Sequence, residues 1–120
     1  MIEKMIRVGQ LYDIYGALLT ERQRKCLEFH YLQDLSLGEI AAHFCVSRQA
    51  VNDILRRSEE ALEQYESVLK LLTQEQTQKE SLQKIRELLS ESLSGQDTRT
   101  KILQALEGVN KILEQEVGTE

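Results

Sequence analysis

Proline and tryptophan are absent from this 120-residue chain, and phenylalanine occurs only twice. Because proline interrupts helices, its absence leaves long stretches of Glu, Gln, Leu, Lys and Arg free to continue as helix. Residues that favour strands do not alternate with polar ones over strand-length runs, so the pattern contains no sheet. The length suits one domain, or one small domain with an appendage. The composition therefore predicts an all-α protein.

Long hydrophobic runs are also missing. No apolar stretch approaches the ~20 residues needed to cross a bilayer, which argues against membrane insertion. Charged residues interrupt the apolar ones over Met1–Arg7, unlike a secretory signal. The two cysteines are too few for a disulfide framework in a chain of this kind. These absences predict a cytoplasmic protein.

Signals for chemistry are few. A zinc set of Cys26, His30, His43 and Cys45 can be imagined, but neither cysteine has the short Cys-x-x-Cys spacing of structural zinc sites. The alternative is that Cys26 is a small core residue with His30 one turn further along the same helix. No nucleophile with a base, and no glycine-rich phosphate loop, is visible, and His43 and Asp53 suit a surface better than catalysis. The sequence predicts a binding module without catalytic residues, cofactor or metal.

Residues 36–57 have the pattern of two short helices joined by a tight turn. Ser36 and Glu39 are spaced as a capping box, and Ser47 can cap the second helix. The turn is Phe44–Val46, where Cys45 stands at a position that often needs a positive φ and glycine. The apolar positions that a crossed helix pair would bury are Ile40, Ala41, Phe44, Val46, Val51, Ile54 and Leu55. This pattern predicts a helix-turn-helix motif.

The details of the motif resemble region four of bacterial sigma factors over residues 20–66. The resemblance is carried by Glu39-Ile40-Ala41, Val46-Ser47-Arg48, Val51 and Arg56-Arg57. The whole chain is similar to the YlxM family, through the run Val46–Val51, the leader Leu11–Gly16 and Leu18-Leu19-Thr20. YlxM proteins are small bacterial helix-turn-helix proteins whose genes neighbour the signal recognition particle GTPase. The resemblance implies a sigma region-four-like fold, in the winged-helix-like DNA-binding class without a sheet, and a regulatory role with a suggested part in protein targeting.

The polar side of the second motif helix suits DNA. Arginine pairs well with guanine, and Gln or Asn with adenine, so Arg48, Gln49 and Asn52 are the candidate base readers. Arg56 and Arg57, with Arg22 and Arg24 from the preceding helix, are the candidate phosphate contacts. The alternative is that Arg48 and Arg56 are solvated or paired with nearby acids. The full candidate DNA-binding set is Ser47, Arg48, Gln49, Asn52, Asp53, Arg56, Arg57, Arg22 and Arg24.

The net charge of −5 weighs against a strong nucleic-acid binder. The segment 47–57 is locally positive, with three arginines and one aspartate. A few arginines in an acidic protein predict weak, salt-sensitive DNA binding, which a homodimer would strengthen by doubling the contacts. The acidic balance leaves a second hypothesis open: a protein-interaction adaptor that contacts the signal recognition particle GTPase, its receptor or its RNA.

The remaining pattern predicts two segments, a helix-turn-helix domain over 1–72 and a helical hairpin over 73–120 that packs on it or dimerises. Helices are expected over 2–18, over about 20–32 with a capping box at Thr20 and Gln23, and from Arg48 to about Leu72. The last of these carries a heptad seam, Val51, Leu55, Ser58, Leu62, Tyr65, Leu69 and Leu72.

The hairpin is expected to begin after a break or bend at Thr73–Lys79. Its first helix is marked by Leu82, Ile85, Leu88, Leu89 and Leu93, and should end at Ser94-Gly95-Gln96 with Gly95 as terminator. Its second helix should open at Asp97 or Thr98 and carry the apolar stripe Ile102, Leu103, Leu106, Val109, Leu113 and Val117, with Ile112 alongside. Such a hairpin is too small to be stable alone, which favours a homodimer.

Overall fold

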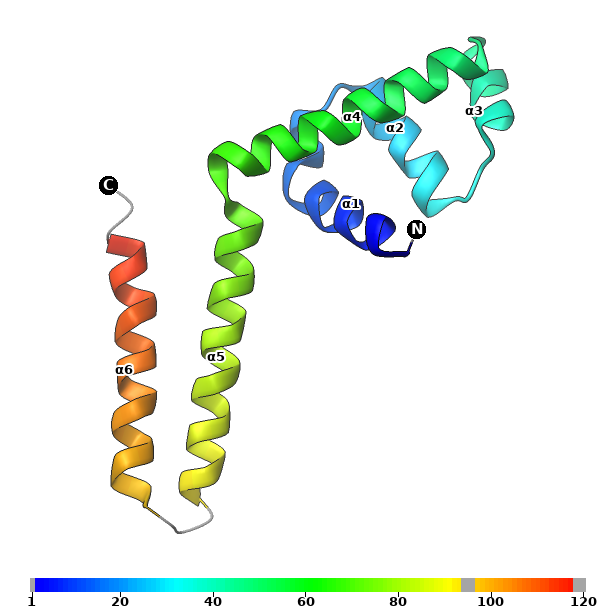
Figure 1. Ribbon diagram of the computed structural model, residues 1–120. Helices are drawn as coiled ribbons and strands as arrows, with labels where there is room; N and C mark the ends of the chain where they lie inside the picture. Colours follow the sequence, from blue (N-terminus) through cyan, green and yellow to red (C-terminus); the bar gives the residue numbers. More distant parts are fainter. Residues whose placement is uncertain (1, 94–96, 118–120) are drawn as a thin grey trace. The chain divides into compact units, whose positions relative to one another are not determined.

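The computed structural model describes residues 2–93 and 97–117 (Figure 1). These residues form six α-helices and no strand, which confirms the all-α prediction. The chain divides into two compact units, Met1–Leu72 and Thr73–Glu120. Within the described residues, no helix combines the length and the hydrophobicity that a membrane span requires.

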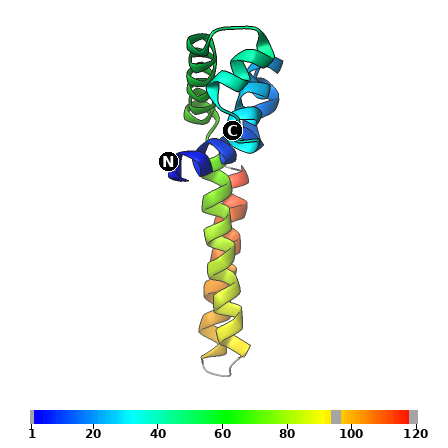
Figure 2. The same ribbon diagram turned by 90° about the vertical axis from the view of Figure 1, so that its right-hand side faces the viewer.

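The N-terminal unit contains four of the helices (Figures 1 and 2). They are α1 (Ile2–Tyr15), α2 (Glu21–Leu27), α3 (Leu37–Phe44) and α4 (Arg48–Leu69), with a 3₁₀ turn at Gly16–Leu18 and a π-helical segment at Glu28–Leu32. Both expected capping boxes are present, because Thr20 and Gln23 exchange backbone and side-chain hydrogen bonds, as do Ser36 and Glu39. Local capping chemistry therefore sets where α2 and α3 begin.

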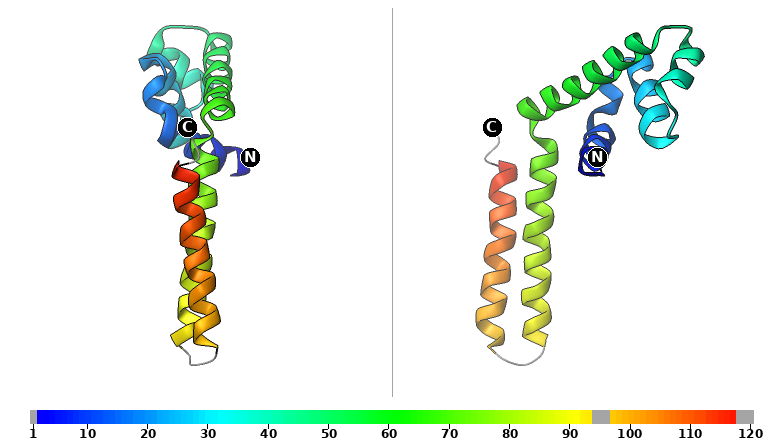
Figure 3. Two further views of the ribbon diagram at one scale, coloured as in Figure 1. Left: turned by 90° about the vertical axis from the view of Figure 1, so that its left-hand side faces the viewer. Right: turned by 45° about the vertical axis from the view of Figure 1, so that its right-hand side comes forward.

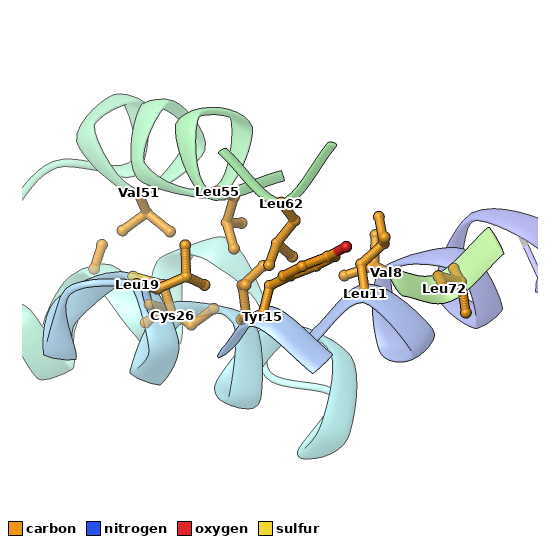
Figure 4. Close-up of a cluster of buried hydrophobic side chains, with 12 residues drawn as sticks. Val8, Leu11, Tyr15, Leu19, Cys26, Val51, Leu55, Leu62 and Leu72 are labelled. Atoms are coloured by element: carbon orange, nitrogen blue, oxygen red, sulfur yellow. The ribbon is translucent and has the colours of Figure 1, made fainter. Parts of the chain in front are cut away.

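The core of this unit lies between α4 and the shorter helices (Figure 4). Val51, Leu55 and Leu62 of α4 are 5% exposed or less, and they meet Leu11 and Tyr15 of α1 in one cluster. The predicted heptad seam is thus buried from Val51 to Leu62, whereas Leu69 at its far end is 47% exposed. Cys26 is fully buried in the same cluster, as the core interpretation of that cysteine expects.

The expected end of α4 at about Leu72 is wrong by three residues. The break or bend expected at Thr73–Lys79 is also wrong, because the chain turns before that stretch. The helix stops at Leu69, and Lys70 turns the chain with φ 54 and ψ 31. The next helix, α5 (Leu71–Leu93), then runs without interruption through the polar stretch. Glutamine, glutamate and lysine favour helix, so the polar composition of Thr73–Lys79 does not end α5.

A buried polar group explains why the break falls at Lys70. Tyr15 donates its hydroxyl to Glu66 Oε1 at 2.7 Å, and the Leu72 N–H donates to the same oxygen at 3.0 Å. The Leu71 N–H donates to the Tyr15 hydroxyl at 3.1 Å. The first N–H groups of a helix have no partner within the helix. Here Tyr15 and Glu66 accept hydrogen bonds from the first N–H groups of α5, which makes a new helix start possible at this point.

The C-terminal unit consists of the rest of α5 and of α6 (Thr98–Val117), which run side by side in opposite directions (Figures 1 and 3). Ile85 and Ala105 are its buried apolar side chains, and a salt bridge of 2.6 Å joins Lys101 to Glu91. The start of α6 at Thr98 agrees with the prediction. The expected terminator at Ser94-Gly95-Gln96 lies outside the described residues.

The apolar stripe expected on α6 is not the side that packs against α5. Ile102, Leu103, Leu106, Val109 and Leu113 are all 39–54% exposed. The side that faces α5 is instead shifted by one residue, with Ala105 buried and Lys101, Gly108 and Ile112 half-buried. The close approach needs a small residue, since a Cβ on Gly108 would lie 2.8 Å from Ile85 Cγ1.

Candidate nucleic-acid interface

The candidate interface is the corner between α3 and α4. Ser36 caps α3, and Ser47 caps α4 by accepting the Ala50 N–H at 3.0 Å. Between them, Cys45 adopts φ 55 and ψ 45, the left-handed conformation expected for this turn. Ile40 and Ala41 of α3 and Val51 of α4 are buried where the helices cross. The bihelical corner predicted from the sequence is confirmed.

The predicted DNA-contacting residues of α4 lie on its outer side. Val51 and Leu55 are buried and Ile54 packs against the core, so the helical period turns Gln49, Asn52 and Arg56 outward. The exposed members of the predicted set are Ser47, Arg48, Gln49, Asn52, Arg56 and Arg57, whereas Asp53 is half-buried. The first turns of α4 therefore present a row of cations and amides to solvent.

Arg48 lies back against α3. A Cβ on Gly38 would be 3.0 Å from one guanidinium nitrogen of Arg48 and 3.1 Å from Nε. Because Gly38 has no side chain, the guanidinium can rest over the first turn of α3. Arg48 would have to swing away from this position to reach a base edge. This contact could not be predicted from the sequence, because it joins residues ten positions apart across the turn.

Arg56 is already engaged by an acid. Its Nη2 donates to Asp53 Oδ1 at 3.2 Å, one helical turn away, and the side chains of Arg56 and Asp53 are 61% and 42% exposed. This is the pairing that the alternative interpretation of the sequence anticipated for Arg56. Exposed pairs of this kind contribute about 0.2–1 kcal/mol or less, so a phosphate can compete for the arginine.

An arginine from α2 approaches the same corner. The guanidinium of Arg22 lies 5.5 Å from the centre of the Phe44 ring, which holds it beside the end of α3 by a cation–π contact. Phe44 in turn contacts His43 and Phe29, at ring distances of 5.1 and 5.8 Å. Phe44 therefore positions the Arg22 guanidinium in addition to packing against the core.

The imagined zinc set is not assembled. Cys26 is fully buried, where desolvation raises the pKa of its thiol, and Cys45 is exposed at the turn. No three histidine, cysteine, aspartate or glutamate side chains come together in the described part of the chain in a way that could hold a metal ion.

Comparison with known proteins agrees with this geometry. Residues 2–106 match the family UPF0122, described as "Putative helix-turn-helix protein, YlxM / p13 like". A UPF0122 protein of Bacillus mycoides strain KBAB4 is 44% identical over 107 residues, which span 89% of this chain and 97% of that protein. UPF0122 proteins of Bacillus thuringiensis strain Al Hakam and Bacillus cereus strain AH187 are 43% identical over the same coverage.

The family match covers the helix-turn-helix corner, all of α5 and the first half of α6. Its description names the same motif that the capped helices and the left-handed turn form here. The chain therefore belongs to the UPF0122 family of YlxM-like helix-turn-helix proteins.

Proposed function

We propose that this protein is a DNA-binding regulator that inserts the first turns of α4 into the major groove. The observation that supports this most directly is the exposed row of Arg48, Gln49 and Asn52 at the start of a capped helix, beside a helix-turn-helix corner. Helix-turn-helix proteins use this part of their second motif helix to read base edges. Arg48 and Gln49 are the residues best placed to confer sequence preference, by bidentate contacts to guanine and adenine.

The phosphate contacts in this proposal come from both sides of the motif. Arg57 lies further along the same outer side of α4, and Arg22 is held over Phe44 at the end of α3. Arg56 exchanges Asp53 for a phosphate, and Arg24, which is half-buried, completes the α2 side. Such contacts fix the register of the protein on the duplex without reading its sequence.

The test is fluorescence anisotropy with genomic and random duplex fragments at low salt. The double variant Arg48→Ala, Gln49→Ala should lose at least about 30-fold in affinity for its preferred fragment, because each of the two bidentate base contacts is worth ~1–3 kcal/mol. A matched control removes one cation and one amide from the hairpin, Lys84→Ala with Gln83→Ala, and should change the affinity less than two-fold. Equal binding by both double variants would refute the assignment of α4.

A second candidate is an adaptor for the signal recognition particle, and the charge distribution favours it. The chain carries a net charge of −5, and one of the three arginines of the 47–57 segment is paired with Asp53. Purified particle components, added to this protein, test the idea through their mobility and GTP hydrolysis. If neither changes while DNA binding is measurable, the DNA-binding role stands alone.

A further inference from the structure

The hairpin of the C-terminal unit leaves most of its large apolar side chains uncovered. The inner seam between α5 and α6 is built from Ile85, Leu88, Ala105 and Ile112 around Gly108. Of these, Ile85 and Ala105 are 8% and 5% exposed. Small residues let the two helices approach closely, but the seam buries too little apolar surface to stabilise a helix pair by itself.

A second apolar stripe lies one residue further along each helix. It consists of Leu82, Leu89, Ile102, Leu106, Val109 and Leu113, which are 39–56% exposed. The exposed Arg86 lies between Leu82 and Leu89 on the α5 side of this stripe. On α6 the members are spaced by four, three and four residues, the heptad spacing of a packing seam. One residue turns a helix by about 100°. The helices α5 and α6 are antiparallel (Figures 1 and 3), so that turn carries both stripes to the same side of the hairpin.

The opposite side of the hairpin is polar. One residue before the inner seam, the helices present exposed Lys84, Glu87, Glu107 and Lys111, with further polar residues in line at Glu80, Glu91 and Gln104. The hairpin thus has one charged side suited to water and one apolar side, which we call the leucine face after its six members listed above. Contiguous apolar surface of this kind marks an interaction site.

We propose that the leucine face binds the leucine face of a second copy of this chain, so that two hairpins form a four-helix bundle. The face is two helices wide, and a second two-helix face covers both of its stripes, whereas a single helix would cover one groove. Heptad-spaced stripes packing at small crossing angles are the geometry of such bundles. This inference goes beyond DNA binding and does not depend on it.

The area agrees with a stable dimer. A fully buried Leu side chain removes roughly 100 Å² from water. Six half-exposed side chains, with Leu93 and Leu103 at 89% and 53% exposure on the rim, then supply about 440 Å² of apolar surface per copy. Homodimer interfaces are about two-thirds apolar, which gives ~660 Å² per copy. Stable interfaces bury ~600–1,000 Å² per partner, so this area lies at the lower end of the range.

The test is sedimentation equilibrium of the full chain over a range of concentrations. The wild type should approach twice the monomer mass of 13.9 kDa. The double variant Leu89→Ala, Leu106→Ala should raise the dissociation constant at least about 30-fold, and each single variant about 5-fold. The matched double variant on the polar side, Glu87→Ala with Glu107→Ala, should stay within three-fold of wild type. Alanine is the best helix former, so these changes do not remove helix propensity.

A capture experiment gives an independent readout. Tagged wild-type chain should retain untagged wild-type chain after mixing, and should fail to retain the leucine variant. A wild type that stays monomeric up to about 100 μM would overturn the proposal and indicate that another part of the same chain, or a different protein, covers the face. Equal dimerisation by the leucine and glutamate variants would also overturn it. DNA affinity, measured separately, reports on α4 and not on this face.

Discussion

Cys45 occupies the most constrained backbone position of the helix-turn-helix corner. Its φ of 55 lies in the left-handed region, where a Cβ crowds the following carbonyl and costs ~1–2 kcal/mol. The side chain is exposed, and its Sγ makes a weak hydrogen bond of 3.9 Å to the Ala42 carbonyl oxygen. Removing the Cys45 side chain would therefore cost the folded state little stability.

The variant Cys45→Gly should raise the free energy of unfolding by about 0.5–1 kcal/mol. Glycine adopts this conformation freely, although its greater freedom in the unfolded state offsets part of the gain. Urea unfolding followed by circular dichroism measures the change. The control Ala42→Gly, in the exposed interior of α3, should lower the stability by ~1 kcal/mol. A loss of stability in both variants would show that Cys45 is not strained.

Three tyrosines of the N-terminal unit donate their hydroxyls to carboxylates. Tyr15 donates to Glu66, Tyr12 to Glu28 and Tyr31 to Glu59. Burial and the hydrogen bond to Glu66 raise the pKa of Tyr15. The hydrogen bond to Glu28, followed by burial, raises the pKa of Tyr12, and burial with the hydrogen bond to Glu59 raises that of Tyr31. The folded state therefore holds these phenolic protons more tightly than the unfolded chain.

Stability should consequently fall in alkali. A raised folded-state pKa contributes stability that is complete below the unfolded value of ~10 and is lost as the pH rises through the folded value. Urea midpoints should be constant from pH 8 to 9 and decline above pH 10. Tyr15→Phe should flatten that decline. It should also lower the melting temperature at pH 8 by about 5 °C, because the Leu71 N–H loses its acceptor. A midpoint unchanged at pH 11 would contradict this account.

At the scale of the element, the close packing of α5 on α6 depends on Gly108. Glycine within a helix normally costs ~1 kcal/mol relative to alanine, so the sequence marks this position as a weak point of α6. The structure assigns it a packing role, because a Cβ there would lie 2.8 Å from Ile85 Cγ1 and 3.1 Å from Cδ1.

Gly108→Ala should therefore destabilise the hairpin by about 1–3 kcal/mol despite its better helix propensity. The double variant with Ile85→Ala supplies the missing space, and its loss should be smaller than the sum of the two single losses. Thermal melting of the full chain and of the three variants measures this coupling. Strictly additive losses would mean that residues 85 and 108 do not share the crowded space.

The whole molecule is acidic, yet its motif helix begins with a positive row. Phosphate contacts release counterions, so the logarithm of DNA affinity should fall with the logarithm of salt concentration with a slope of about −0.9 per contact. Four contacts, from Arg22, Arg24, Arg56 and Arg57, predict a slope of about −3.6 for one chain. A dimer that engages two half-sites would show about −7.

Anisotropy titrations between 50 and 200 mM salt test this prediction. Arg57→Ala should make the slope shallower by about 0.9, whereas Lys84→Ala on the hairpin should leave it unchanged. A slope near zero in the wild type would show that the arginines do not contact phosphates and would favour the adaptor role.

Much of the local structure could be predicted because it depends on residues close together in the chain. The capping boxes at Thr20 and Ser36, the cap at Ser47 and the left-handed turn at Cys45 each involve groups within four residues of one another. The hydrophobic period of α4 likewise identified the side that is buried. The same period left the amides and arginines of the candidate interface pointing outward, so their exposure could be predicted while their partners could not.

By itself, the sequence determined an all-α protein of the helix-turn-helix class, because caps and periodicity act over single turns. The tertiary structure decided what depends on distant partners. Glu66 bonds to Tyr15, which is 51 residues earlier, and this pair sets the break at Lys70. Gly108 allows Ile85 to approach, and this contact selects which of two adjacent stripes on α6 faces inward. Both stripes on α6 have the same helical period, so the period alone cannot determine which of them packs against α5.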